Sequence, residues 1–289
     1  MIQTTLVARS FGTPATSRLR ATEWKRLGVF LAFGVAAFLL AVVGAGFAPL
    51  GWPDALRRWA HPHIFVPLGI TLTVLLLRRE GSTVPCSERF NPWPVGWSSA
   101  GWFVAGVALL AATLPVFVLA FGLRWTANGE FTGTTLALTL WGIFLTAAAE
   151  EIGFRGYAFW RLIRLIGFWP AQAIVAGLFA VSHLTLGGFA LLPALVGTVT
   201  GSLLFGAVFA RTQSVAAPIA LHTGWNLCQH LLLSPLDPTA TPLIVRFPHA
   251  PSPAEHASML GWVGLVMVAG TVVALRFRVN VVEKGTGPE

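Results

Sequence analysis

The sequence contains three short polar motifs, each within or beside a long apolar stretch, and the first offers acid–base chemistry. It is the run from Glu150 to Arg155. On a helix, Glu151 and Arg155 are neighbours at i and i+4, in the order that favours an ion pair. Glu150 then lies about 100° around the helix without a local cation. Such a glutamate suits a general acid or base, although both glutamates could also simply end a helix at a membrane interface.

The other two motifs are F-x-x-x-H and H-x-x-x-N, each of which places its two polar or aromatic residues on one helix face. The first contains Phe179 and His183, and the second contains His222 and Asn226. The N–H groups of an imidazole and a carboxamide side by side could stabilise a developing oxyanion. Taken singly, His183 could be a hydrogen-bonded core residue, and the His222/Asn226 pair could be a polar clamp between helices.

Taken together and in this order, the motifs E-E-x-x-x-R, F-x-x-x-H and H-x-x-x-N resemble those of the CPBP family. That family contains the type II CAAX prenyl endopeptidases and their prokaryotic Abi relatives, which are linked to bacteriocin processing and self-immunity. Every motif position matches, over roughly residues 130–235. The resemblance implies an intramembrane endopeptidase in which Glu150 is the general base, His183 positions the water, and His222 and Asn226 stabilise the oxyanion. We assign a supporting role to the remaining motif residues, Glu151, Arg155 and Phe179.

The resemblance leaves the participation of a metal open. Glu150, His183 and His222 could form a three-ligand zinc site with an open position for water. However, the chain has no H-E-x-x-H, in which a separate glutamate acts as base beside the metal ligands. If Glu150 were a ligand, the base would have to be Glu151, which has a ready partner in Arg155. We therefore favour a metal-free site without a cofactor, and zinc is the alternative.

The composition predicts an all-α polytopic membrane protein. The 289 residues are 55% hydrophobic and only 10% charged, whereas soluble domains are about 25% charged. The net charge of +8 comes from basic residues that punctuate apolar runs, which favours contact with lipid headgroups and not with nucleic acid. Eight runs are long enough to cross a bilayer, at 27–47, 59–77, 101–122, 131–149, two within 165–210 that part at Gly187-Gly188, 214–233 and 257–275.

These runs give a simple domain organisation. We expect a cytoplasmic N-terminal tail at 1–26, a transmembrane domain at 27–276 and a cytoplasmic C-terminal tail at 277–289. Segments 78–100 and 234–256 are expected to be loops, and His61 and His63 beside the second span are given no role.

One difficulty follows from these span limits: Glu150 lies near the cytoplasmic end of its span and His183 near the outer end of its own. For the two to meet, the fourth helix must continue past Arg155 or the limits must shift by about a turn.

Two other functions fit parts of the pattern. A proton-coupled carrier could use Glu150 and the histidines as a relay, but no inverted repeat is visible in the sequence. A non-catalytic immunity or scaffold protein could keep the same fold. For a protease, the expected partners are the lipid bilayer and a peptide or protein substrate, which is membrane-embedded, or prenylated if the host prenylates proteins.

The distribution of basic residues predicts the orientation in the plasma (inner) membrane. With the N-terminus in the cytoplasm, 15 of the 19 Lys and Arg residues fall on the cytoplasmic side and 4 on the other side. Reporter fusions should therefore place both termini in the cytoplasm. A C-terminal fusion found on the outer side would contradict an even number of spans.

Overall fold

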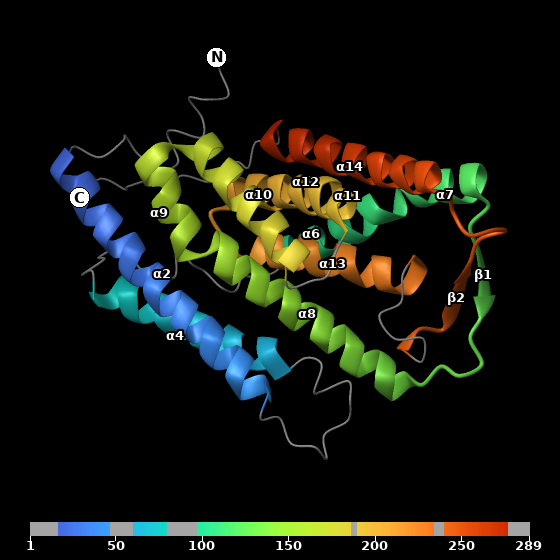
Figure 1. Ribbon diagram of the computed structural model, residues 1–289, viewed down its shortest axis with the longest axis horizontal. Helices are drawn as coiled ribbons and strands as arrows, with labels where there is room; N and C mark the ends of the chain where they lie inside the picture. The colour runs from blue at the N-terminus through green and yellow to red at the C-terminus, as the bar shows by residue number, and fades with distance from the viewer. Residues whose placement is uncertain (1–16, 47–59, 80–96, 186–189, 234–239, 277–289) are drawn as a thin grey trace, which may run out of the picture.

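The computed structural model describes residues 17–46, 60–79, 97–185, 190–233 and 240–276, and the predicted all-α membrane fold is confirmed. Figure 1 shows the helices in chain order. They are α2 (Ser17–Gly46), α4 (Ala60–Arg79), α6 (Trp97–Ala111), α7 (Leu114–Phe121), α8 (Gly133–Arg155), α9 (Tyr157–Ile166), α10 (Phe168–Thr185), α11 (Leu191–Pro193), the π-helical turn η1 (Ala194–Thr198), α12 (Val199–Thr212), α13 (Ala216–Leu232) and α14 (Pro253–Arg276).

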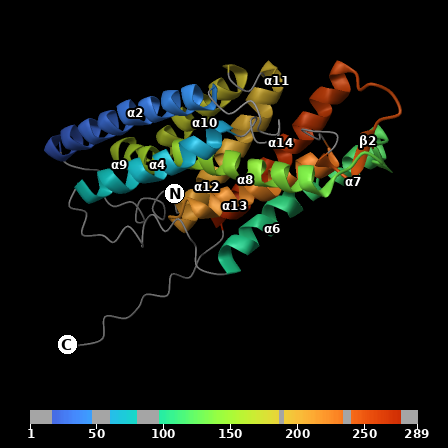
Figure 2. The same cartoon turned by 90° about the horizontal axis from the view of Figure 1, so that it is seen from below.

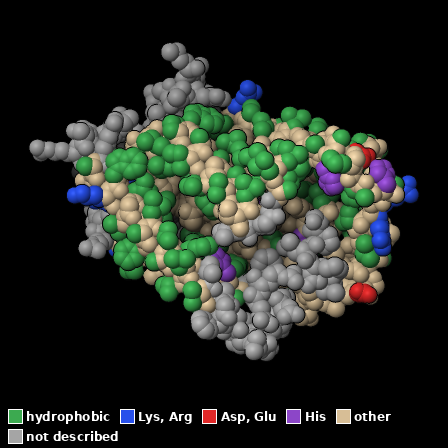
Figure 3. Space-filling view, viewed as in Figure 1, with side chains coloured by type: hydrophobic (Ala, Val, Ile, Leu, Met, Phe, Trp, Pro, Cys, Tyr) green, Lys and Arg blue, Asp and Glu red, His purple; other side chains and the backbone are tan. Residues whose placement is uncertain are grey.

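Six helical stretches in the described residues are long and apolar enough to cross a bilayer. A seventh, Ala60–Leu76, is apolar but shorter. Figure 3 shows that apolar side chains cover much of the visible face, as expected of a surface in contact with lipid. The chain is therefore a multi-pass membrane protein. The six stretches are Ala21–Ala41, Ser99–Phe121, Gly133–Ile166, Phe168–Thr185, Leu191–Thr212 and Pro253–Arg276.

The helix limits differ from the predicted spans in three places. Helix α2 begins at Ser17, ten residues before the predicted first span, and the third span is divided into α6 and α7. The fourth helix, α8, continues to Arg155, and a separate helix, α9, follows it before α10 begins. This continuation removes the difficulty with Glu150, which now lies more than a turn inside α8. The Gly187-Gly188 break, both extreme termini and most of loop 78–100 lie outside the described residues.

Helix α8 lies at the centre of the bundle. Figures 1 and 2 show it running between the α2/α4 pair on one side and α13 with its neighbours on the other. It packs directly on α4, α9 and α13, while α12 packs on α10, α13 and α14. The largest apolar core lies among α6, α12, α13 and α14 and includes Leu204, Phe205, Leu221 and Trp225. Residues on α8 can therefore contact side chains from both halves of the bundle.

A two-stranded antiparallel sheet was not predicted. Its strands are β1 (Arg124–Ala127), after α7, and β2 (Leu243–Arg246), in the loop expected at 234–256. The indole of Trp125 donates a hydrogen bond to the Leu232 carbonyl at the end of α13, at 2.8 Å. The sheet thus ties two connecting segments to the helix that carries His222. Such short strands leave little pattern in a sequence, because their pairing partner lies more than 100 residues away.

Helices α6 and α13 pack with backbone against backbone. A Cβ added at Gly106 on α6 would collide with the Leu221 carbonyl oxygen, and one at Gly224 on α13 would collide with the Phe103 carbonyl oxygen. Small residues allow this close approach between membrane helices. The position of α13 therefore depends on glycine at both sites.

Replacing either glycine should separate the two helices. We expect Gly106→Ala and Gly224→Ala each to destabilise the fold by about 1–3 kcal/mol, the usual cost of overpacking, and to lower the melting temperature in detergent. The matched control is Gly101→Ala on the same helix α6, where a Cβ meets no atom within 4 Å. A melting temperature of Gly106→Ala equal to that of the control would contradict this packing.

Candidate active site

The motif residues occupy three neighbouring helices. Glu150, Glu151 and Arg155 lie on α8, and Phe179 and His183 lie on α10, whereas His222 and Asn226 lie on α13. Because α8 packs on α13 and its last turns meet α10, residues more than 70 positions apart in the sequence come within contact distance.

The innermost part of the site is a buried ion pair. Arg155 Nη1 donates to both carboxylate oxygens of Glu151 at 2.8 Å, and neither side chain is exposed. The sequence predicted this pair. It did not predict that the same carboxylate also meets His222, whose Nδ1 lies 2.9 Å from Glu151 Oε1. Because a carboxylate only accepts, His222 Nδ1 carries a proton and donates it here.

Residues of α10 and α12, most of them outside the motifs, hold the Arg155 guanidinium in place. Its Nη2 donates to the hydroxyl of Ser202 on α12 at 2.7 Å, and its centre lies 5.1 Å from the Phe179 ring and 5.2 Å from the Phe205 ring. Gln172 on α10 donates to the Ser202 carbonyl at 2.9 Å. Sequence analysis missed Ser202, Phe205 and Gln172. They lie in the charge-free region 165–210, where only their polar or aromatic type could have marked them.

Glu150 has a different environment from its neighbour. Its carboxylate lies 4.0 Å from His183 Nε2 and 3.7 Å from His222 Nε2, and 23% of its side chain is exposed. Both distances exceed a hydrogen bond, so a small molecule such as water could bridge the groups. Among the described residues, Glu150 makes no direct hydrogen bond and no closer ion pair.

Each histidine is oriented by a partner on its Nδ1 atom. His183 Nδ1 lies 2.9 Å from the carbonyl oxygen of Phe179, which can only accept, so this nitrogen carries the proton. The His183 ring also contacts the Phe179 ring edge to face at 4.5 Å, while the His222 ring stacks on Phe205 at 4.4 Å. The Nε2 atoms of both histidines are therefore held toward Glu150.

Asn226 lies one helical turn beyond His222 on α13 and is partly buried. Its carboxamide makes no hydrogen bond to another described residue. The structure thus brings Glu150, His183 and His222 into one group, and it places Asn226 beside that group through the helix that it shares with His222.

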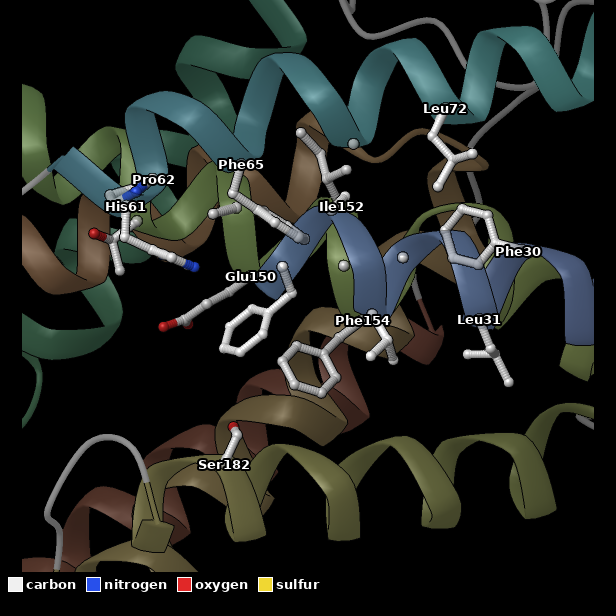
Figure 4. A pocket seen from close by; sticks show the side chains of 18 of the residues that line it. Phe30, Leu31, His61, Pro62, Phe65, Leu72, Glu150, Ile152, Phe154 and Ser182 are labelled. Atoms are coloured by element: carbon white, nitrogen blue, oxygen red, sulfur yellow. The ribbon is translucent and has the colours of Figure 1, made fainter. Parts of the chain in front are cut away.

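A mainly apolar cavity of about 520 Å³ adjoins this group. Its walls come from α2, α4, α8 and α10, and Figure 4 shows Glu150 among the side chains that line it. His183 is another of its few polar lining residues. The cavity is large enough to hold a peptide side chain or another apolar group beside the Glu150 carboxylate.

In this structure Glu150 lies too far from His183 and His222 for the three side chains to bind one zinc ion. Two tetrahedral zinc ligands at about 2.0–2.1 Å from the metal would lie roughly 3.3 Å apart. The carboxylate–imidazole distances are 3.7 and 4.0 Å, and among the described residues no group of three His, Cys, Asp or Glu side chains is arranged to hold a metal ion.

Comparison with known proteins supports the resemblance to a protease family. Residues 132–228 match the family model described as Rce1-like: Type II CAAX prenyl endopeptidase Rce1-like. The resemblance to the CPBP family is confirmed. The Rce1-like segment covers about a third of the chain, from the start of α8 to near the end of α13, and contains all seven motif residues. Neither the curated proteins nor the solved structures contained a significant match to the chain.

The buried pair predicts that two similar substitutions, Glu151→Gln and Glu150→Gln, differ in their effect on stability. Glu151→Gln leaves the Arg155 charge buried without a counter-charge, which costs about 3–5 kcal/mol, so its melting temperature in detergent should fall well below that of the wild type. The matched control is Glu150→Gln, which removes no close ion pair and should melt near the wild type. Equal melting temperatures for the two variants would contradict the structural role of Glu151.

Proposed function

We propose that the protein is an intramembrane endopeptidase that hydrolyses a peptide bond with a water molecule activated by Glu150. The observation that carries the proposal is the position of the Glu150 carboxylate, which faces two imidazole Nε2 atoms at 3.7 and 4.0 Å at the wall of the cavity. The Rce1-like match also supports a protease.

In the first step, water binds between Glu150 and His183. Because His183 donates from Nδ1 to the Phe179 carbonyl, its Nε2 is the unprotonated nitrogen and can accept a hydrogen bond from the water. The Glu150 carboxylate accepts the water's other hydrogen bond. As the water oxygen attacks the scissile carbonyl carbon, Glu150 takes its proton.

The attack places negative charge on the carbonyl oxygen, and N–H donors on α13 stabilise it. Asn226 supplies its carboxamide N–H. His222 can donate from Nε2 only when both of its nitrogens carry protons, because Nδ1–H is already engaged by Glu151. The Glu151 carboxylate stabilises that cation, as the carboxylate partner of a catalytic histidine does in other hydrolases. Preorganised donors in a site shielded from water are especially effective.

Collapse of the tetrahedral intermediate completes the reaction. The C–N bond breaks, and Glu150 returns its proton to the leaving amine, so that one water is consumed and a carboxylic acid and an amine are formed; the other water proton remains on the new carboxyl group. Glu150 is then ready for another water. Glu151 and Arg155 take no part in bond making, and their role is to hold the His222 ring in place and, through Glu151, to stabilise its protonated form.

The position of the site favours substrates that reach it through the membrane. The cavity is bounded by transmembrane helices and lined mainly by apolar side chains, so an apolar or lipid-modified peptide segment suits it. A prenylated peptide is one such substrate in a host that prenylates proteins. We propose residence in the plasma (inner) membrane with both termini in the cytoplasm.

The test of this function is cleavage by the Glu150→Gln variant. Glutamine keeps the size of the side chain but cannot act as the base, so cleavage should fall by at least about 100-fold, the lower range for general base catalysis. The assay uses purified protein in liposomes with internally quenched apolar peptides, with and without a prenylated cysteine, and mass spectrometry identifies the cleaved bond. Cleavage by Glu150→Gln at the wild-type rate would eliminate Glu150 as the base.

The same assay tests for a metal. Because the donor distances do not fit zinc, we expect wild-type cleavage to persist after exhaustive chelation. Stoichiometric zinc that is lost together with activity, and that restores activity when added back, would contradict the metal-free mechanism.

A further inference from the structure

A third histidine lies on the wall of the same cavity. His61, in the first turn of α4, lines the cavity together with Glu150 and His183. Figure 4 shows its ring extending from α4 toward the part of the cavity that contains the Glu150 carboxylate. Sequence analysis assigned no role to His61, because it lies outside the three motifs and at the edge of a predicted span.

Aromatic neighbours fix the orientation of the His61 ring. The ring stacks on Phe65, with the centroids 5.8 Å apart and an angle of 12° between the planes. It also meets the ring of Phe38 on α2 edge to face at 5.1 Å. An imidazole fixed between two apolar rings keeps its polar atoms in a defined place, as a binding group must.

The Nε2 atom of His61 has no hydrogen-bond partner among the described residues and is closed off from water. A buried polar atom without a partner costs free energy, and such an atom calls for an explanation. His63 on the same helix differs, because its Nε2 accepts a hydrogen bond from the indole of Trp141 at 2.9 Å. Phenylalanine at position 61 would keep the ring contacts with Phe38 and Phe65 without this cost.

We propose that His61 is a substrate-binding residue: when a peptide enters the cavity and displaces the side chains that cover Nε2, this atom donates a hydrogen bond to a carbonyl oxygen of the peptide. The inference rests on the proposed function. A peptide whose scissile carbonyl lies at Glu150 extends along the cavity. The carbonyl oxygens of the residues on either side of the scissile bond can then accept a hydrogen bond. His61 then positions the chain across the cavity from Glu150, and the apolar walls accommodate its side chains.

The carbonyl oxygen could belong to an internal peptide bond or to a C-terminal carboxylate. Two apolar, internally quenched peptides of identical sequence distinguish these sources, one ending in a free acid and the other in an amide. If replacing His61 raises KM for both peptides, the acceptor is the oxygen of an internal peptide bond. If replacing His61 raises KM only for the peptide that ends in a free acid, the acceptor is the C-terminal carboxylate. Either result supports His61 as the donor.

The informative variant is His61→Phe, assayed as full-length protein in liposomes. Loss of one hydrogen bond that is made equally in the ground and transition states raises KM without changing kcat. We expect KM to rise about five- to tenfold and kcat to stay within about twofold of the wild type. His61→Gln keeps an N–H donor and should restore KM to near the wild-type value. The control His63→Phe, on the same helix, should leave both constants unchanged.

A role confined to packing gives a different result. His61→Phe preserves the ring and removes an unsatisfied nitrogen, so for packing alone it would melt at or above the wild-type temperature and keep the wild-type KM. An unchanged KM for both peptides would overturn the proposal. A fall in kcat with an unchanged KM would overturn it as well.

A binding experiment separates this inference from the proposed function. The dissociation constants of the same two peptides are measured for Glu150→Gln and for the double variant Glu150→Gln/His61→Phe, so no cleavage is required. Weaker binding by the double variant supports His61 even if the wild type cleaves neither peptide. If the wild type cleaves the peptides and the two variants bind them equally, the inference fails while the proposed function stands.

Discussion

The arrangement of the site depends on one buried positive charge. Arg155 is fully enclosed within a membrane-spanning bundle, where an unpaired charge is very unfavourable, and Glu151 supplies the counter-charge from the preceding turn of the same helix. The guanidinium also reaches Ser202 on α12 and lies between the rings of Phe179 and Phe205. Satisfying this one charge therefore fixes the relative positions of α8, α10 and α12.

The same interaction divides two adjacent glutamates between two roles. Glu151 is wholly engaged by Arg155 and by His222, so it orients the imidazole but cannot leave its partners. Glu150, one residue earlier, points to the cavity and meets His183 and His222 only at distances that a small molecule can bridge. The helical angle of about 100° between neighbouring residues produces this difference. Helix α13 can position His222 beside Glu150 and Glu151 because Gly106 and Gly224 allow α13 to approach α6 closely.

Much of the fold and of the candidate site was predictable from the sequence, for identifiable reasons. The apolar runs gave the membrane helices, because a bilayer requires long stretches without charge. The spacing of Glu151 and Arg155 gave the ion pair, because that contact is local to one helix. The contact between Glu151 and His222 was not predictable, because it depends on how α8 and α13 pack. The support from Ser202, the β1–β2 sheet and the cavity position of His61 are equally non-local.

The central claim is that water attacks the peptide carbonyl directly, with Glu150 as base and not as nucleophile. The most direct measurement is a single turnover of excess wild-type enzyme in ¹⁸O-labelled water, followed by mass spectrometry of the product and of the enzyme peptide that contains Glu150. Direct attack predicts one ¹⁸O atom in the new carboxylate of the product and none in Glu150. A product without ¹⁸O, together with a labelled Glu150, would show that the glutamate had formed a covalent acyl intermediate and would contradict the mechanism.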